Sequence, residues 1–140
     1  MTRALGLDLG TVRIGVATSD PGRVIASPYD VINRGKDHGA DHAAIAGAVA
    51  ESESTVVVVG LPRAMSGRDS EATRTIRAEV DELRAMLSVP IVLWDERLST
   101  VTAQKALIEG GVRRKQRKGS VDKVAAAVIL QSWLDAGCPG

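Results

Sequence analysis

The 140-residue sequence contains no phenylalanine and only 2% aromatic residues, so aliphatic side chains must build its core. Its single cysteine, Cys138, has no partner for a disulfide within the chain, which predicts a cytoplasmic location. Neither a secretory leader nor an apolar run of about eighteen residues is present, which argues against a membrane partner. No sign of charge dominates: the formal net charge is +1, so the total charge indicates no polyanionic partner.

The length and composition are those of one globular domain. A chain of this size can bury roughly two thirds of its unfolded surface. Hydrophobic residues make up 44% of the sequence and charged residues 25%, which is ordinary for a globular protein. We therefore expect residues 1–140 to form a single domain.

The first twenty residues predict a β-hairpin, with Gly10-Thr11 as its turn. Alternation along the first strand places leucines on one face and Ala4, Gly6 and Asp8 on the other. Glycine weakens a strand unless something must come close to its backbone. The small face therefore predicts close approach by a helix, a ligand or nucleic acid, with Asp8 at its end.

The rest of the chain alternates between strand and helix patterns. The predicted elements are a third strand from Val24 to Ile32, a loop over 33–39, a helix from its N-cap Asp41 to about Glu53, a buried strand from Thr55 to Gly60, a loop over 63–69, an amphipathic helix carrying Ile76, Val80, Leu83 and Leu87, a strand from Pro90 to Trp94, a short helix over 101–109, and a buried helix from Val121 to Leu134 capped by Ser120. The order βββαβαβαα predicts an α/β domain with a mixed sheet, because helical crossovers make the later strands parallel.

Acidic residues occur at the ends of three buried elements: Asp8, the pair Asp95-Glu96, and Asp122. Structural explanations also exist. Asp122, in the first turn of a helix, could interact favourably with the helix dipole, and the pair Asp95-Glu96 could bind Arg97 or water. Together they would repel one another unless a cation lay between them. Carboxylate oxygens are hard ligands, so the cluster predicts Mg²⁺ or Mn²⁺.

Gly60 decides which acid of the pair can meet Asp8. It ends a strand that should lie between the strands carrying Asp8 and Asp95-Glu96, and it has no side chain to fill the gap. Successive strand residues point to opposite faces, so only one of the pair should face Asp8. The longer Glu96 is the better candidate.

Five cations gather just before the last helix: Arg113, Arg114, Lys115, Arg117 and Lys118. The segment has little apolar content, so we expect a mobile loop that binds phosphates, although it could also be a solvated charge run. Arg63, Arg68 and Arg97 are further candidates for phosphate contacts. His38 and His42 have neither a cysteine nor a third histidine nearby, which argues against zinc.

Four blocks of the sequence resemble the signature blocks of the YqgF/RuvX family. They are Gly6–Gly10 with Arg13–Ala17 and Ser19-Asp20, Val59–Pro62 with Met65–Gly67, Asp95–Thr100, and Val121–Lys123 with Ala125-Ala126 and Ile129-Leu130. The resemblance implies a ribonuclease H-like fold with strand order 3-2-1-4-5. It also implies a nuclease of the 5′ end of pre-16S rRNA in ribosome biogenesis or, alternatively, of Holliday junctions in DNA recombination and repair.

The catalytic acids carried over by this resemblance are Asp8, Asp95-Glu96 and Asp122. Two divalent ions could stabilise the attacking and leaving oxygens of a phosphodiester, with Asp8 between them and Glu96 and Asp122 each holding one. Such nucleases often have four carboxylates, whereas this chain offers three acidic sites. The number of metal ions bound, one or two, therefore stays open. The partner would be precursor rRNA or branched DNA, and symmetric cleavage of a junction would require a homodimer.

Two other functions remain open from the sequence. Asp8-Leu-Gly-Thr11 also resembles the phosphate-binding hairpin of actin, heat-shock chaperones and sugar kinases, which would make the protein an ATPase. Those proteins use two such domains, and this chain has the length of one. A non-catalytic RNA-binding factor would keep the basic residues but would not need the three acidic sites.

Overall fold

The structure is a computed structural model that describes residues 2–62, 70–98 and 114–139, without the side chains of 114–123. Within these residues, none of the helices combines the length and the apolar character that crossing a bilayer requires. The short helix expected over 101–109 lies outside the described residues.

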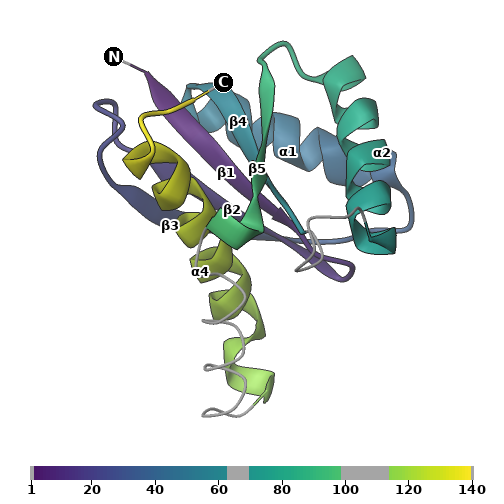
Figure 1. Ribbon diagram of the computed structural model, residues 1–140. Coiled ribbons are helices and arrows are strands. Elements are labelled where there is room, and N and C mark those ends of the chain that lie inside the picture. The colour runs from purple at the N-terminus through teal and green to yellow at the C-terminus, as the bar shows by residue number, and fades with distance from the viewer. Residues whose placement is uncertain (1, 63–69, 99–113, 140) are drawn as a thin grey trace.

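A five-stranded mixed sheet forms the centre of the molecule (Figure 1). Its strands are β1 (Arg3–Leu9), β2 (Arg13–Ser19), β3 (Ala26–Asn33), β4 (Ser54–Leu61) and β5 (Ile91–Asp95). They lie in the order β3-β2-β1-β4-β5, with the first three antiparallel and β1, β4 and β5 parallel. The predicted class, topology and strand order are therefore confirmed.

The third strand begins later than predicted. Val24 and Ile25 donate their backbone N–H groups to the carboxylate of Asp20, both at 2.8 Å, so they belong to the turn. These bonds, led by the one from Ile25, hold the pKa of Asp20 below its usual value. Asp20 therefore has a structural role in this turn.

Helices cover both faces of the sheet. α1 (His38–Ser52) and α2 (Glu71–Met86) lie on one face and α4 (Arg114–Asp135) on the other, while the 3-10 turn η1 (Glu96–Leu98) follows β5 (Figure 1). α1 begins earlier than predicted because Asp37, and not Asp41, is its N-cap: its side chain accepts a hydrogen bond from the backbone N–H of Ala40.

α4 also begins earlier than predicted. The expected loop over Arg113 to Lys118 is wrong for residues 114–118, and the expected N-cap Ser120 lies inside the helix. Arginine, lysine and glutamine are good helix formers, and one glycine inside a helix costs only about 1 kcal/mol. Gly119 and Ser120 therefore do not stop the helix.

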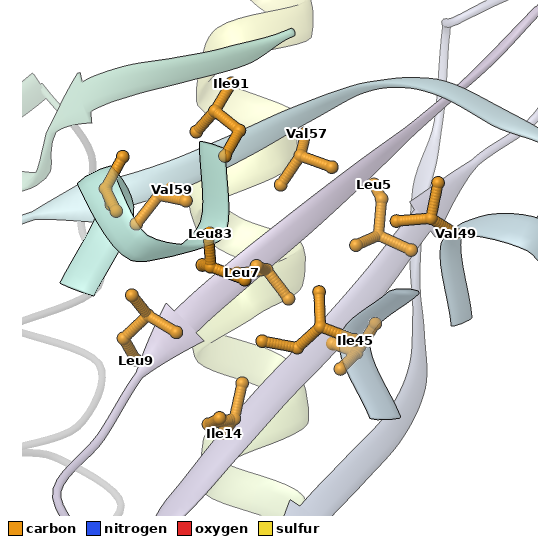
Figure 2. Packing of buried hydrophobic residues seen from close by; sticks show 12 residues of the cluster. Leu5, Leu7, Leu9, Ile14, Ile45, Val49, Val57, Val59, Leu83 and Ile91 are labelled. Atoms are coloured by element: carbon orange, nitrogen blue, oxygen red, sulfur yellow. The ribbon is translucent and has the colours of Figure 1, made fainter. Parts of the chain in front are cut away.

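The two faces of the sheet have different cores. The bulky face, which carries Leu5, Leu7, Leu9, Val57 and Val59, packs against α1 and α2 (Figure 2). The small-residue face, which carries Ala4, Gly6, Ala17 and Gly60, packs against Ala126, Ile129 and Leu130 of α4. A Cβ atom on Gly6 would lie 2.8 Å from Leu130 Cβ and 3.0 Å from the Ala126 carbonyl oxygen. The close approach predicted from the glycines is therefore made by a helix.

Candidate active site

An open cavity of about 660 Å³ lies at the carboxyl ends of the parallel strands. Its walls come from the turn after β1, the loop before α1, the first residue of α1, the N-terminal half of α2, and η1. Four carboxylates line it, from Asp8, Glu71, Glu79 and Glu96, against one described guanidinium, that of Arg34. Such a wall attracts cations and would repel a phosphate that arrived without one.

Asp8 reaches the cavity from the end of the central strand. It follows Ala4 and Gly6 on the small-residue face, and only 5% of its surface is exposed. In the antiparallel pair Asp8 lies opposite Gly15 of β2, so no bulky side chain stands beside it on that strand. The sequence Gly10-Thr11 then turns the chain and contributes both residues to the cavity wall.

Glu96 reaches the same cavity from the first residue of η1. Its Oε1 atom lies 3.0 Å from the position that a Cβ atom on Gly60 would occupy. The missing side chain of Gly60 therefore makes room for the Glu96 carboxylate next to β4. α4 also fixes this turn, because the Ser132 hydroxyl accepts a hydrogen bond from Trp94 Nε1 at 3.0 Å and donates one to the Leu98 carbonyl at 2.8 Å.

Asp95 is held in a different way from its neighbour. Its carboxylate binds the Arg97 guanidinium, with Oδ2 at 2.7 Å from Nη2 and 3.0 Å from Nε, and it also accepts the Arg97 backbone N–H at 2.9 Å. The hydrogen bond from Asp95 raises the pKa of Arg97 above its usual value. The structure thus brings Glu96 together with Asp8 and pairs Asp95 with Arg97.

The side chains of the remaining predicted site residues lie outside the part of the chain that the structure describes. Arg63, Arg68 and Arg113 lie outside the described residues. The backbones of the other five belong to α4, and their side chains are outside the described part: Arg114, Lys115, Arg117, Lys118 and Asp122.

An ionic cluster that the sequence did not predict lies beside the cavity and contributes Arg34, His38 and Glu79 to its lining. Arg34 binds both carboxylate oxygens of Glu79 at 2.8 Å and Asp41 at 3.3 Å. It also donates from Nε to the Gly10 carbonyl at 2.7 Å and from its backbone N–H to the Val12 carbonyl at 3.0 Å. Arg34 therefore ties α1 and α2 to the turn that follows Asp8.

Two histidines of α1 complete this cluster. His42 Nε2 lies 2.9 Å from Glu79 Oε2, and His38 Nδ1 lies 2.8 Å from Glu82 Oε2. Burial alone would raise the pKa of Glu79, but the hydrogen bonds from Arg34 and His42 outweigh it and hold the pKa below its usual value. The hydrogen bond to Glu82 raises the pKa of His38, against a smaller opposing effect of burial.

One signal in the sequence could have revealed this cluster. Glu79 stands on the apolar stripe of α2, three residues after Ile76 and next to Val80, where a charge needs a buried partner. The spacing of His38 and His42 places both on one side of a helix. What the sequence does not show is that the two helices bring these side chains together.

Comparisons with known proteins identify the family and the fold. A family model described as "RuvX: Holliday junction resolvase" matches residues 2–136. A protein of Mycobacterium ulcerans (strain Agy99), named "Putative pre-16S rRNA nuclease", is 44% identical over 134 residues, covering 95% of this chain and 78% of its own. A protein of the same name from Ruegeria pomeroyi is 46% identical over 130 residues, covering 93% and 84%.

A solved structure, Thermus thermophilus RuvC in complex with a Holliday junction substrate, superimposes with a TM-score of 0.61. The match covers 99% of this chain and 96% of that one at 15% identity, so it shows a shared fold. That fold is ribonuclease H-like, as the sequence resemblance implied.

Proposed function

This chain belongs to the RuvX family of resolvase-type nucleases, and we propose that it is a metal-dependent endonuclease that hydrolyses phosphodiester bonds of structured nucleic acid. The observation that carries the proposal is that Asp8 and Glu96 line one acidic cavity at the strand ends. A single-domain protein with one cysteine that acts on precursor rRNA would work in the cytoplasm.

The described donors fit a hard divalent cation. Carboxylate oxygens suit Mg²⁺ and Mn²⁺, and Gly60 leaves the Glu96 carboxylate the space that a Cβ atom would fill. Asp8 and Glu96 would hold the cation, which supplies positive charge to the attacking and leaving oxygens of the phosphodiester. Without that charge, the four carboxylates of the wall would repel the substrate.

We propose Asp122 as the third ligand from its position in α4. Asp122 precedes Ala126 by four residues, and Ala126 lies against Gly6. Asp8 follows Gly6 by two residues on the same strand face. Because residues four apart lie one above the other on a helix, we expect Asp122 to stand beside Asp8.

Precursor 16S rRNA is the substrate that we favour, with processing of its 5′ end in ribosome biogenesis as the reaction. The two relatives named above, at 44% and 46% identity, carry the name of a pre-16S rRNA nuclease. The description of the family model favours the alternative, a Holliday junction. Only the alternative requires a homodimer, because two strands must be cut symmetrically.

A cleavage assay tests the function. The purified protein should cut an RNA spanning the 5′ end of precursor 16S rRNA with Mg²⁺ or Mn²⁺, and EDTA should stop the reaction. Asp8→Asn should abolish cleavage and keep the thermal midpoint, because the side chain keeps its shape and loses its charge. Undiminished cleavage by folded Asp8→Asn would remove the central assignment. Faster cleavage of a four-way DNA junction, by a dimer in sedimentation, would select the alternative.

The choice between the neighbouring acids has its own matched pair of variants. Glu96→Gln should lower the cleavage rate by at least about a hundredfold, since removing even one positioned hydrogen-bond donor from an active site has an effect of that size. Asp95→Asn should have a smaller effect, because the Asp95 carboxylate binds Arg97 and Asp95 is not among the residues that line the cavity. The reverse order would mean that Asp95 is the ligand.

The basic segment is proposed to bind the substrate backbone. Replacing Arg113, Arg114 and Lys115 with alanine should weaken binding at moderate salt and change the rate at saturating substrate much less. Removing Z phosphate contacts should flatten the slope of log affinity against log salt by about 0.9Z on a duplex. If the triple variant binds with unchanged affinity and unchanged salt dependence, the substrate does not contact this segment, and Arg63 and Arg68 become the next candidates.

A further inference from the structure

Two histidines and a glutamate meet beside the cavity, and two of the three, His38 and Glu79, line it. His38 and His42 come from one side of α1, and Glu79 comes from α2. One ligand atom of each lies within 4.8 Å of the other two, and among the described residues no other three histidine, cysteine or acidic side chains gather so closely. Ligands of a tetrahedral zinc ion lie about 3.3 Å apart, as follows from bonds of about 2.0 Å.

Two of the three donors already stand at such a separation. His42 Nε2 lies 2.9 Å from Glu79 Oε2, and both residues are only 3% exposed, so their positions are held by packing. The side chain of His38 is 49% exposed and belongs to the first residue of α1, so it can turn towards the other two donors. The third ligand can thus move into place without disturbing the core.

The charges around the three donors leave room for a dication. The Arg34 guanidinium faces the carboxylates of Asp41 and Glu79, and Glu82 adds a third. With neutral imidazoles, one positive and three negative charges leave the cluster with an excess of two negative charges. Arg34 also fixes the orientation of Glu79 through both oxygens, as an outer-shell partner of a metal ligand does.

We propose that His38, His42 and Glu79 form a binding site for a borderline transition-metal dication such as Zn²⁺, with ligands other than the carboxylates of Asp8 and Glu96. The sequence argued against zinc because no third ligand lies near the two histidines along the chain, and Glu79 of α2 supplies that ligand. Imidazole nitrogens suit zinc, whereas an all-carboxylate set suits Mg²⁺ and Mn²⁺. On binding, the proton that His42 Nε2 shares with Glu79 is exchanged through solvent for one on Nδ1, so the imidazole stays neutral, and Nε2 and the Glu79 oxygen both bond to the metal. Three protein ligands leave the fourth position open to the cavity, where His38 and Glu79 are lining residues.

Metal binding tests the site independently of nuclease activity. The probe is Zn²⁺, titrated calorimetrically into the untagged full-length protein in millimolar Mg²⁺, which occupies hard carboxylate sites. A Cys138→Ser background removes the one thiol. Co²⁺ then replaces Zn²⁺ as a spectroscopic probe, since tetrahedral coordination gives intense visible absorption. We expect one Zn²⁺ per chain and a tetrahedral Co²⁺ spectrum.

Matched variants separate this site from the carboxylate site. His38→Gln should weaken Zn²⁺ binding by more than about tenfold and leave the fold intact, because the side chain is half exposed. His42→Gln should weaken it further, and Asp8→Asn should leave it unchanged. Absence of Zn²⁺ binding in Mg²⁺, or equal affinity of His38→Gln and the parent protein, would overturn the proposal. A loss caused by Asp8→Asn would also overturn it, because the metal would then sit at the carboxylates.

Discussion

The two faces of one strand, β1, are packed in opposite ways. On the bulky face, Leu5, Leu7 and Leu9 fill the space between the sheet and the helices α1 and α2 (Figure 2). On the small-residue face, Ala4 and Gly6 let the backbone of α4 come within contact distance of the strand. One face is stabilised by interlocking side chains and the other by close approach of two backbones.

This difference explains where the candidate site lies. Large side chains on the bulky face separate the sheet from its helices, so an acid there would be covered by leucine and valine. On the small-residue face the helix lies close to the strand, and the row Ala4, Gly6, Asp8 leads to the cavity. A helix held this close can bring a carboxylate of its own to the strand end, which is the role proposed for Asp122.

The largest effect on stability should come from removing volume on the bulky face. Leu7→Ala should lower the free energy of unfolding by about 3 kcal/mol, because Leu7 is fully buried and leaves a cavity. Chemical denaturation measures the change, with Leu98→Ala as the control, since Leu98 is 63% exposed and its loss should cost less than about 0.5 kcal/mol. Equal effects of the two variants would contradict the described core.

A smaller loss should come from adding volume on the other face. Gly6→Ala should lower the free energy of unfolding by about 2 kcal/mol, because the new methyl group would meet Leu130 Cβ at 2.8 Å and the Ala126 carbonyl at 3.0 Å. Neither atom can rotate away. The control is Gly47→Ala in α1, where a Cβ atom would meet no neighbour within 4 Å. This substitution should stabilise the helix by about 0.5–1 kcal/mol.

If Gly6→Ala were neutral, α4 would have to be free to move away from the sheet. The comparison between the faces would then fail, because close backbone contact would not be what holds the small-residue face together. If Gly47→Ala destabilised the protein as much as Gly6→Ala does, the effect would belong to glycine substitution in general.

Local pattern was enough to predict the asymmetry of β1. Alternation placed Leu5 and Leu7 on one face and Gly6 and Asp8 on the other, because a strand has a side-chain period of two. The gap at Gly60 could also be predicted, because helical crossovers commonly place later strands beside the first and the glycine ends one of them. The strand order came from the family resemblance, because long-range strand pairing is not encoded in any single segment.

The ionic cluster beside the cavity could not be predicted in the same way. The contacts of Arg34 and His42 with Glu79 join residues that lie 45 and 37 positions apart, and they exist only once α1 and α2 pack side by side. The start of α4 was missed for a local reason. Gly119-Ser120 is typical of a loop and a helix cap, but strong helix formers on both sides extend the helix through it.

The smallest effect on stability, and the sharpest test of the comparison, should come from Gly60→Ala. A Cβ atom there would lie 2.5 Å from Ile129 Cδ1, the end of a side chain, 3.1 Å from Ile129 Cγ1 and 3.0 Å from Glu96 Oε1. Ile129 can turn away, and alanine costs less backbone entropy than glycine, so we expect the free energy of unfolding to change by less than about 1 kcal/mol. Glu96 must move, and displacing a reactive group by about 1 Å can lower a rate by about a hundredfold.

Gly60→Ala should therefore lose cleavage and keep stability, whereas folded Gly6→Ala should lose stability and keep most of its cleavage. Denaturation and the rate at saturating substrate, measured on both variants, give the crossed result. Because both glycines lie on the small-residue face, a crossed result would divide that face into a part that holds α4 and a part that makes room for a carboxylate. Parallel losses in the two variants would mean that Gly60, like Gly6, serves only the packing of the helix, and Glu96 would then need another argument for its place in the site.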